Sequence, residues 1–213
     1  MILLSTAYLG NIQYYTKLLQ TAQPVVIDLG EYYRKQSFRN RCEILGANGV
    51  IPLTVPVYKI SGEKIPVCEV RIDHSKAWRH QHWNSIHSAY KNSPYFDYYA
   101  ESFEPLYQRQ YDWLWELNRD LQQAVMEILE IRADFSYSFE YRVSAENDRD
   151  WRNALSEKPR LHKSDPDFLP ASYYQVFSER TEFQPNLSIL DLLFCEGPNA
   201  LELIRKSAGN DRF

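Results

Sequence analysis

The chain has 213 residues, 24 basic and 28 acidic side chains, and a formal net charge of −4 at pH 7. This length suits one domain with a sizeable core, and we expect a single domain over residues 1–213. Because charges of both signs are interspersed, neither nucleic acid nor an anionic membrane surface is indicated as a partner. Aromatic residues make up 15% of the chain. Such rings can form walls for sugars, and they also fill cores.

The cysteines and the first residues predict a cytoplasmic protein. Three cysteines, an odd number without CxxC spacing, offer no disulfide framework and indicate reduced thiols. The opening MILLSTAYLG has no basic region or long apolar core, so it predicts a first strand and not a signal peptide. No segment approaches the ~20 apolar residues of a membrane span, and we expect no membrane insertion.

The N-terminal residues predict a β-α-β unit. Strands over residues 2–4 and 24–29 flank a helical run over 12–20, and the short connections favour a parallel sheet. The predicted fold class is therefore α/β, with a mixed, largely parallel sheet opened by this unit, flanking helices and a C-terminal helical pair. Loops at the carboxyl ends of such strands bind ligands. The Ser5–Asn11 loop, with Ser5, Thr6 and Tyr8, is thus a candidate binding element.

A hairpin is predicted next. Alternation places Phe38, Asn40, Cys42 and Ile44 on one face of a strand, with Arg39, Arg41 and Glu43 on the other. Ala47-Asn48-Gly49 is a turn signal, and residues 50–57 return as the partner strand. Five basic residues gather here, and they suit either a phosphate or carboxylate ligand or a solvated strand face: Arg34, Lys35, Arg39, Arg41 and Lys59.

Residues 67–72 alternate as a strand, and Ser75 is placed to cap a helix over residues 76–90. Trp78, His82, Ile86 and Ala89 form the apolar side of this helix, while His80 faces solvent. His82 is either a general base or a hydrogen-bonded core histidine. No second ligand lies at a fitting spacing, so no metal site is predicted.

The second half of the chain predicts more helices than strands. We expect a short aromatic helix over 95–99, a long helix over 105–131, a strand over 134–141, an irregular loop or lid over 142–172, and a strand over 173–177. A helix from Ile189 then ends at Gly197, and another follows over 200–205. Asn118 interrupts the apolar stripe of the long helix and must be hydrogen-bonded.

The most apolar helix contains one acidic residue. From Ile189 to Cys195 every residue except Asp191 is apolar, and a helix that is apolar all round is buried. A buried carboxylate requires a cation, amide donors or a ligand. The alternative interpretation is a capping pair, in which Ser188 is the N-cap and Asp191 its third-residue partner.

Several motifs together carry a resemblance. Tyr174-Gln175-Val176-Phe177, followed by residues 183–194 and Gly197, is similar to the C-terminal signature of the WbqC-like family. Asn40-Arg41 followed by residues 53–57, the Trp78-to-His82 spacing, and Tyr90 with residues 93–96 resemble that family in the same order.

The chain departs from the family pattern at two places. The family often has His-Gln-Pro-x-Tyr-x-Pro-Trp after the first strand, whereas this chain keeps only Tyr8 of that motif. A catalytic role of that first histidine is therefore not transferred to this chain. The stretch 142–172 is shorter than in the longer members and resembles the short, Bacteroidetes-type form.

The resemblance implies a role in O-antigen or other surface-polysaccharide synthesis. Our leading hypothesis is a cytoplasmic enzyme that transfers a group to an activated sugar or aminosugar. Whether it uses a cofactor is unknown from the sequence. Three residues have assigned chemical roles: His82 as base, Asp191 as the group that orients or balances a cation, and Cys42 as the alternative nucleophile. The expected substrate-binding residues are Ser5, Thr6, Tyr8, Asn40, Arg41, Trp78, Tyr90, Tyr174, Gln175, Asn186 and Ser188.

Two alternatives stand beside this hypothesis. The protein could be a non-catalytic module that binds a sugar nucleotide or a partner enzyme of the same pathway. In a purely structural interpretation, Asn40, His82, Asn118 and Asp191 would form one buried hydrogen-bond network.

Overall fold

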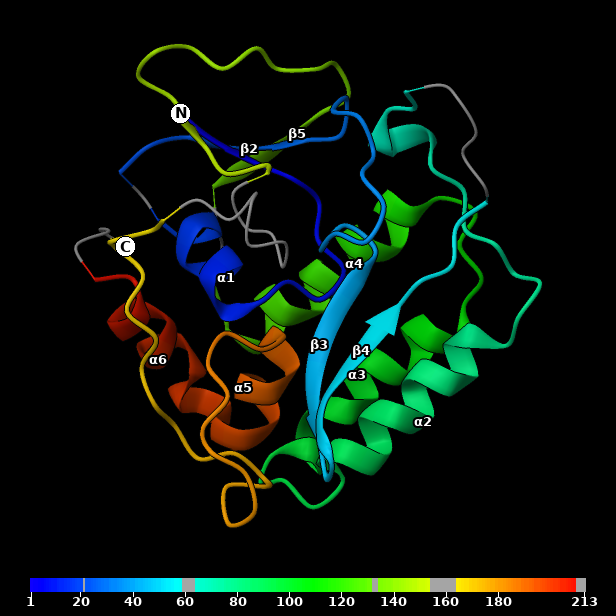
Figure 1. Ribbon diagram of the computed structural model, residues 1–213, viewed down its shortest axis with the longest axis vertical. Coiled ribbons are helices and arrows are strands. Elements are labelled where there is room, and N and C mark those ends of the chain that lie inside the picture. The colour runs from blue at the N-terminus through cyan, green and yellow to red at the C-terminus, as the bar shows by residue number, and fades with distance from the viewer. Residues whose placement is uncertain (21, 59–63, 132–133, 154–163, 210–213) are drawn as a thin grey trace.

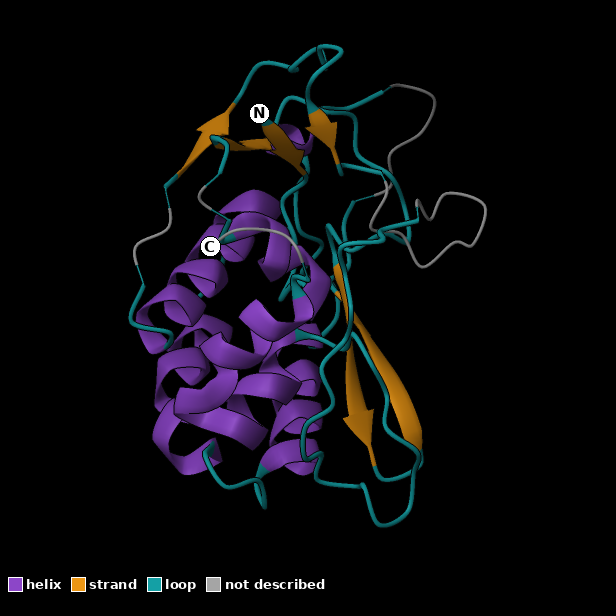
Figure 2. Ribbon diagram, turned by 90° about the vertical axis from the view of Figure 1, so that its left-hand side faces the viewer, coloured by secondary structure: helices purple, strands orange, loops and turns teal. Residues whose placement is uncertain are grey.

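The computed structural model describes residues 1–20, 22–58, 64–131, 134–153 and 164–209. A small sheet lies at one end, helices pack beneath it, and a separate hairpin lies along the helices (Figures 1 and 2). The sheet has the order β5-β2-β1-β6, and every pairing in it is parallel. Its strands are β1 (Ile2–Leu4), β2 (Val25–Asp28), β5 (Phe135–Ser138) and β6 (Arg149–Asp150).

The predicted β-α-β unit is confirmed. Helix α1 (Ile12–Leu18) joins β1 to β2, and the two strands pair with Ile2 opposite Val25. Asn11 caps α1, since its Oδ1 accepts a hydrogen bond from the Tyr14 amide. All three residues of β1 are fully buried, which explains their continuous apolar run. The fold is mixed α/β with a largely parallel sheet.

The hairpin follows its sequence pattern. Strands β3 (Arg41–Gly46) and β4 (Gly49–Thr54) pair antiparallel, with Gly46 opposite Gly49 across the predicted turn. Cys42 and Ile44 face the helices and are buried, as the alternation predicts. In Figure 1 the hairpin crosses in front of α4.

The helices supply most of the core. Helices α2 (Trp78–Tyr90), α3 (Phe96–Gln108) and α4 (Leu114–Ile128) pack in sequence, and α5 (Ile189–Glu196) and α6 (Ala200–Ser207) form the predicted C-terminal pair. Every residue of α5 from Ile189 to Cys195 is buried. The Phe194 ring lies 5.0 Å from Phe96 and 5.3 Å from Tyr90, measured between ring centroids. Among the described residues, no helix is long and apolar enough to cross a bilayer.

Two predicted strands are wrong. Residues 67–69 form a 3₁₀ turn after Pro66, and only Arg71 and Ile72 make isolated bridges. Residues 173–177 form no strand, because the Gln175 side chain takes the place of a backbone partner. Its amide oxygen accepts from the Gln184 amide at 2.9 Å, and its Nε2 donates to the Gln184 carbonyl at 2.9 Å.

The helix boundaries also differ from prediction. The expected helix over 105–131 is broken, since Pro105 lies inside α3 and α4 begins only at Leu114. The link between them pairs with the segment before α2: the Ile72 amide donates to the Asp112 carbonyl, and Trp113 bridges to Arg71. Helix α2 begins at Trp78 without a side-chain cap, so Ser75 is not its N-cap.

Strand β6 lies inside the stretch that was predicted to be irregular. It has only two residues, and Arg149 pairs with Ile2 and Asp150 with Leu3. Part of the lid prediction, residues 154–163, lies outside the described residues.

Replacing Gly197 by alanine is expected to destabilise the fold. Gly197 has φ +52° and ψ −120°, and an added Cβ would lie 2.4 Å from the Tyr95 ring. Gly49 is the control, because its φ is +112° but no atom lies within 4 Å of an added Cβ. Backbone strain alone costs about 1–3 kcal/mol. Urea denaturation should show a larger loss for Gly197→Ala than for Gly49→Ala, and equal losses would contradict the close packing against Tyr95.

Candidate functional site

Three parallel strands end at the same edge of the sheet, beside the Ser5–Asn11 loop. Ser5 follows β1, Gly30 and Glu31 come shortly after β2, and Trp151 and Arg152 follow β6. Because carboxyl ends of parallel strands collect at one edge, residues that are distant in sequence meet there. We call Asp28, Glu31, Arg39, Asp150 and Arg152 the edge cluster.

Arg152 is the centre of the edge cluster. Its Nη1 donates to Asp28 Oδ2 at 2.5 Å and to the Arg142 carbonyl at 2.7 Å. Its Nε donates to Asp150 Oδ1 at 3.0 Å, and Nη2 bonds the other oxygen of Asp150. Arg152 and Asp28 are both buried, so the pair must remain intact to avoid an unpaired buried charge.

Arg39 forms the second buried ion pair. Its Nε donates to Glu31 Oε1 at 2.9 Å, and Nη2 bonds Glu31 Oε2 and the Arg152 carbonyl. Burial raises the pKa of Glu31, and the Arg39 guanidinium opposes that shift. The hydrogen bonds that Arg39 makes with described residues use Nε and Nη2, which leaves Nη1 for a ligand.

A small cavity adjoins the cluster. It has a volume of about 20 Å³, which is room for about one water molecule. Its lining is Ser5, Thr6, Ala7, Asn11, Tyr14, Phe38, Arg39, Trp151 and Arg152. Ser5 Oγ donates to the Arg152 carbonyl at 2.7 Å. Asn118 Nδ2 donates to Thr6 Oγ1 and to the Arg39 carbonyl, while its Oδ1 is buried without a partner among the described residues.

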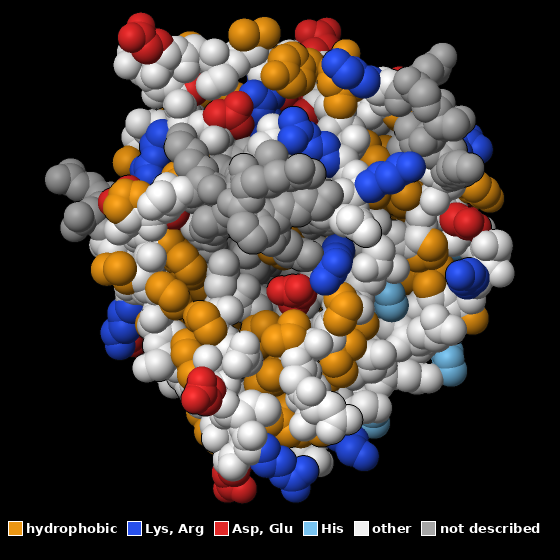
Figure 3. Space-filling model, viewed as in Figure 1, with side chains coloured by type: hydrophobic (Ala, Val, Ile, Leu, Met, Phe, Trp, Pro, Cys, Tyr) orange, Lys and Arg blue, Asp and Glu red, His pale blue; other side chains and the backbone are white. Residues whose placement is uncertain are grey.

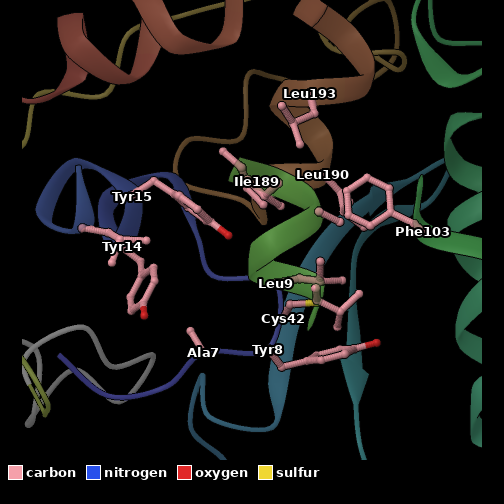
Figure 4. Packing of buried hydrophobic residues seen from close by; sticks show 14 of the residues in the cluster. Ala7, Tyr8, Leu9, Tyr14, Tyr15, Cys42, Phe103, Ile189, Leu190 and Leu193 are labelled. Carbon is pink, nitrogen blue, oxygen red and sulfur yellow. The ribbon is translucent and has the colours of Figure 1, made fainter. Parts of the chain in front are cut away.

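Tyr8 faces the other side of the same loop. In Figure 4 its ring lies next to Cys42, and its hydroxyl points away from Tyr14. The hydroxyl lies 2.8 Å from His82 Nδ1 and 2.7 Å from the Tyr107 hydroxyl. The ring of Trp78 is 5.2 Å from that of His82. Four of the predicted residues, Tyr8, Cys42, Trp78 and His82, therefore lie close together.

His82 is a neutral, buried imidazole. Burial lowers its pKa from 6.5 to about 4, and a hydrogen bond to the Thr54 carbonyl opposes that shift. A carbonyl can only accept, so the ring nitrogen that meets Thr54 carries the proton. The other nitrogen, Nδ1, is then the acceptor for the Tyr8 hydroxyl. His82 does not line the cavity beside the edge cluster.

Asp191 has hydroxyl and amide partners. Tyr90 donates to Oδ1 at 2.8 Å, while Tyr173 and Gln175 donate to Oδ2 at 2.7 and 2.9 Å. Burial raises the pKa of Asp191, and these three hydrogen bonds oppose the shift. The capping-pair interpretation is half right: Ser188 Oγ accepts from the Leu190 amide, but the oxygens of Asp191 accept from side chains.

The three predicted catalytic residues do not form one constellation. His82 and Cys42 lie near Tyr8, whereas Asp191 binds Tyr90. His82 and Tyr90 are eight residues apart on α2, which is about 12 Å along the helix axis.

Most of the other predicted residues hold the backbone. Asn40 Nδ2 donates to the Val55 carbonyl, and Asn186 Oδ1 accepts from the Gln13 amide. Ser188 Oγ donates to the Leu9 carbonyl, Arg41 pairs with Glu43, and Tyr174 is exposed. Of the five basic residues, Arg39 alone belongs to the edge cluster, Arg34 and Lys35 are exposed, and Lys59 lies outside the described residues.

The hypothesis of one structural network is wrong. Asn40, His82, Asn118 and Asp191 are all buried, but each has its own partners, and none bonds another. Trp151 and Arg152 lie in the stretch 142–172, and the charged run Asp148–Arg152 within it was expected to come near the site. Asp28 and Glu31 were not predicted as site residues, although one ends β2 and the other follows it closely.

The fold and this site define an α/β protein with a largely buried cluster of ion pairs at the carboxyl edge of a parallel sheet. The WbqC-like protein family matches residues 6–164, more than half of the chain, and the chain belongs to that family. It is 26% identical over 194 residues to the uncharacterized protein Rv1507c of Mycobacterium tuberculosis (strain ATCC 25618 / H37Rv), which covers 81% of this chain and 84% of that protein. No solved structure matches the chain.

Acid should weaken the fold through His82. The pKa of His82 is 6.5 in the unfolded chain and about 4 in the native state. Between pH 4 and pH 6.5 the native state therefore binds fewer protons than the unfolded chain. The stability that neutral His82 provides is complete above pH 6.5 and is lost as the pH falls to 4, by about 3 kcal/mol. His82→Asn keeps an acceptor near Nδ1 but does not titrate. The stability difference between wild type and His82→Asn, from urea denaturation, should shrink over this range; a constant difference would show that His82 titrates normally.

Asp191 should have the opposite pH dependence. Its native pKa is raised above the ordinary 3.8, so the native state holds a proton that the unfolded chain has lost. The stability advantage of wild type over Asp191→Asn should therefore decline as the pH rises from about 4 through the raised pKa. The same denaturation series measures it. An advantage that grows with pH would mean that the three donors outweigh burial.

Proposed function

We propose that the protein is a cytoplasmic enzyme that transfers a group to a sugar or aminosugar carried on a nucleotide, in the synthesis of O-antigen or another surface polysaccharide. Membership of the WbqC-like family gives the setting for this proposal. The observation that carries it is the pair of buried arginines beside the Ser5–Asn11 loop, at the edge where α/β proteins bind ligands.

Arginine suits the diphosphate of such a substrate. A guanidinium donates parallel hydrogen bonds that match phosphate oxygens. In the proposed complex, Nη1 of Arg39 and the hydroxyls of Ser5 and Thr6 meet the phosphates, and the Trp151 ring supports the sugar or base. The cavity of about 20 Å³ is too small for this ligand, so binding must enlarge it.

Glu31 is the titratable group that binding would affect most. When a phosphate competes for Arg39, Glu31 loses part of its cationic partner, and its already raised pKa rises further. The carboxyl group then takes up a proton. A carboxyl group held in this way is suited to general acid–base chemistry at the edge, whereas His82 is not in reach of this cavity.

A non-catalytic binding module is the second candidate. It is favoured by the loop itself, since Ser5 to Asn11 lack the histidine that the resemblance leads one to expect there. Among the described residues, the lining of the edge cavity contains no histidine and no cysteine. Such a module would bind the nucleotide sugar and leave it unchanged.

One experiment tests both candidates. Thermal stability is measured with nucleotide sugars, aminosugar nucleotides and acyl-coenzyme A donors, alone and in pairs, and each mixture is followed by mass spectrometry. We expect a nucleotide sugar to raise Tm and to be converted when the donor is present. Binding without conversion supports the module, and no shift with any compound contradicts both proposals.

Arg39→Lys is expected to weaken nucleotide-sugar binding about tenfold or more, because a lysine cannot replace the forked hydrogen bonds. Arg109→Lys is the matched control, since Arg109 is an exposed arginine that pairs with Asp120 and does not line the edge cavity. Affinity is measured by titration calorimetry near pH 6 and pH 8. Uptake of a proton by Glu31 predicts tighter binding at the lower pH.

If Arg39→Lys does not fold, Ser5→Ala gives the same test, because it removes only the hydroxyl that bonds the Arg152 carbonyl and Glu31 and leaves both ion pairs in place. Equal affinity of Ser5→Ala and wild type, together with equal affinity at the two pH values, would remove the edge cluster from the binding site.

A further inference from the structure

A second and larger cavity lies between the start of α2 and the end of α3. Its volume is about 530 Å³, within the range of about 300–1,000 Å³ for small-molecule sites. It is lined by His74, Ser75, Lys76, Ala77, Arg79, His80, Trp83, Glu104, Tyr107 and Gln108. Figure 3 shows histidine side chains on the side of the molecule that carries α2. None of these residues belongs to the edge cluster.

One wall of this cavity is aromatic. The rings of Trp83 and Tyr107 lie 5.7 Å apart with an interplanar angle of 31°. Trp83 also stacks on Phe96 at 6.3 Å, which fixes its orientation. A fixed indole ring offers an apolar face to the C–H face of a sugar.

The lining of the cavity contains two basic residues, Lys76 and Arg79, and one acidic residue, Glu104. Neither Lys76 nor Arg79 forms a salt bridge with any residue of the described ranges, and Arg79 Nη1 donates to the Gln108 carbonyl at 2.9 Å. Asp73 does not line the cavity, and its Oδ1 accepts from the Ser75 amide. Two basic side chains on one rim attract an anionic group.

His74 supplies an unused acceptor. Its Nε2 lies 2.9 Å from the Tyr111 carbonyl and therefore carries the proton, because a carbonyl can only accept. In the neutral ring, Nδ1 is then an acceptor, and it is buried without a partner in the described part of the chain. A hydroxyl group is the donor that this nitrogen lacks.

We propose that this cavity is a separate binding site for a phosphorylated sugar. The phosphate lies at Lys76 and Arg79, and one face of the sugar stacks on Trp83. The His74 ring must turn for a sugar hydroxyl to reach its buried Nδ1. The site is independent of the edge cluster. The Tyr107 hydroxyl, however, bonds Tyr8, so an occupant lies one side chain away from the Ser5–Asn11 loop.

The test uses glucose 1-phosphate, inorganic phosphate and glucose as probes of the intact protein. Histidine side-chain NMR reports the place of binding, because His74 and His80 line the cavity while His82 and His87 do not. We expect glucose 1-phosphate to shift the His74 and His80 signals and to bind at least fivefold more tightly than phosphate or glucose. Equal binding of phosphate would overturn the sugar part of the proposal, and no shift at millimolar concentration would overturn the site.

Matched variants locate the phosphate. Lys76→Gln should weaken glucose 1-phosphate binding at least fivefold. Lys91→Gln should not, since Lys91 is exposed at the other end of α2. Both positions are on the surface, so both variants should fold. A ligand that binds only at the edge cluster should leave the His74 and His80 signals unchanged, which separates a failure here from a failure of the proposed function. Equal loss in Lys76→Gln and Lys91→Gln would mean only general charge attraction and would contradict the site.

Discussion

The ion pair between Arg152 and Asp28 holds the carboxyl edge of the sheet together. Asp28 is fully buried, and its two oxygens accept from the Gly30 amide, the Arg142 amide and Arg152. Removing one partner of a buried ion pair costs about 3–5 kcal/mol, because the other charge remains buried. The segments after β2, β5 and β6 are therefore fixed to one another. Gly30 fits this arrangement, since an added Cβ would lie 2.2 Å from the Tyr141 amide nitrogen.

The Ser5–Asn11 loop is held by α5, and this gives the apolar helix its structural role. Ser188 Oγ donates to the Leu9 carbonyl, and the Ile189 amide donates to the Gly10 carbonyl. At the same time Asp191 accepts from Tyr90, which connects α5 to α2. Helix α5 thus positions the loop beside the edge cluster and helix α2 beside the larger cavity. Asp191 acts on these sites through the backbone and through Tyr90, without contact with either cavity.

The sequence predicts well which side chains are buried. It predicts poorly which buried side chains contact one another. The β-α-β unit, the hairpin turn and the burial of Asp191 follow from periodicity and turn chemistry, which are local properties. Arg152 meets Asp28 across 124 residues, and no spacing encodes that contact. The break between α3 and α4 depends on pairing with Arg71 and Ile72, which is also non-local. Lys76 and Arg79 appear in the sequence as the solvated side of a helix, although both line a cavity.

Tyr8 connects the Ser5–Asn11 loop to the lining of the larger cavity through its hydrogen bond to Tyr107, and this bears on the proposed transfer. Reacting atoms must approach to about 3–3.5 Å. Ser5, Thr6 and Ala7 line one cavity, whereas Tyr107, which bonds Tyr8, lines the other. The two cavities share no lining residue. If the edge cluster binds the nucleotide sugar, the group donor must reach it at the sheet edge, and the larger cavity can influence that reaction only through Tyr8 and its loop.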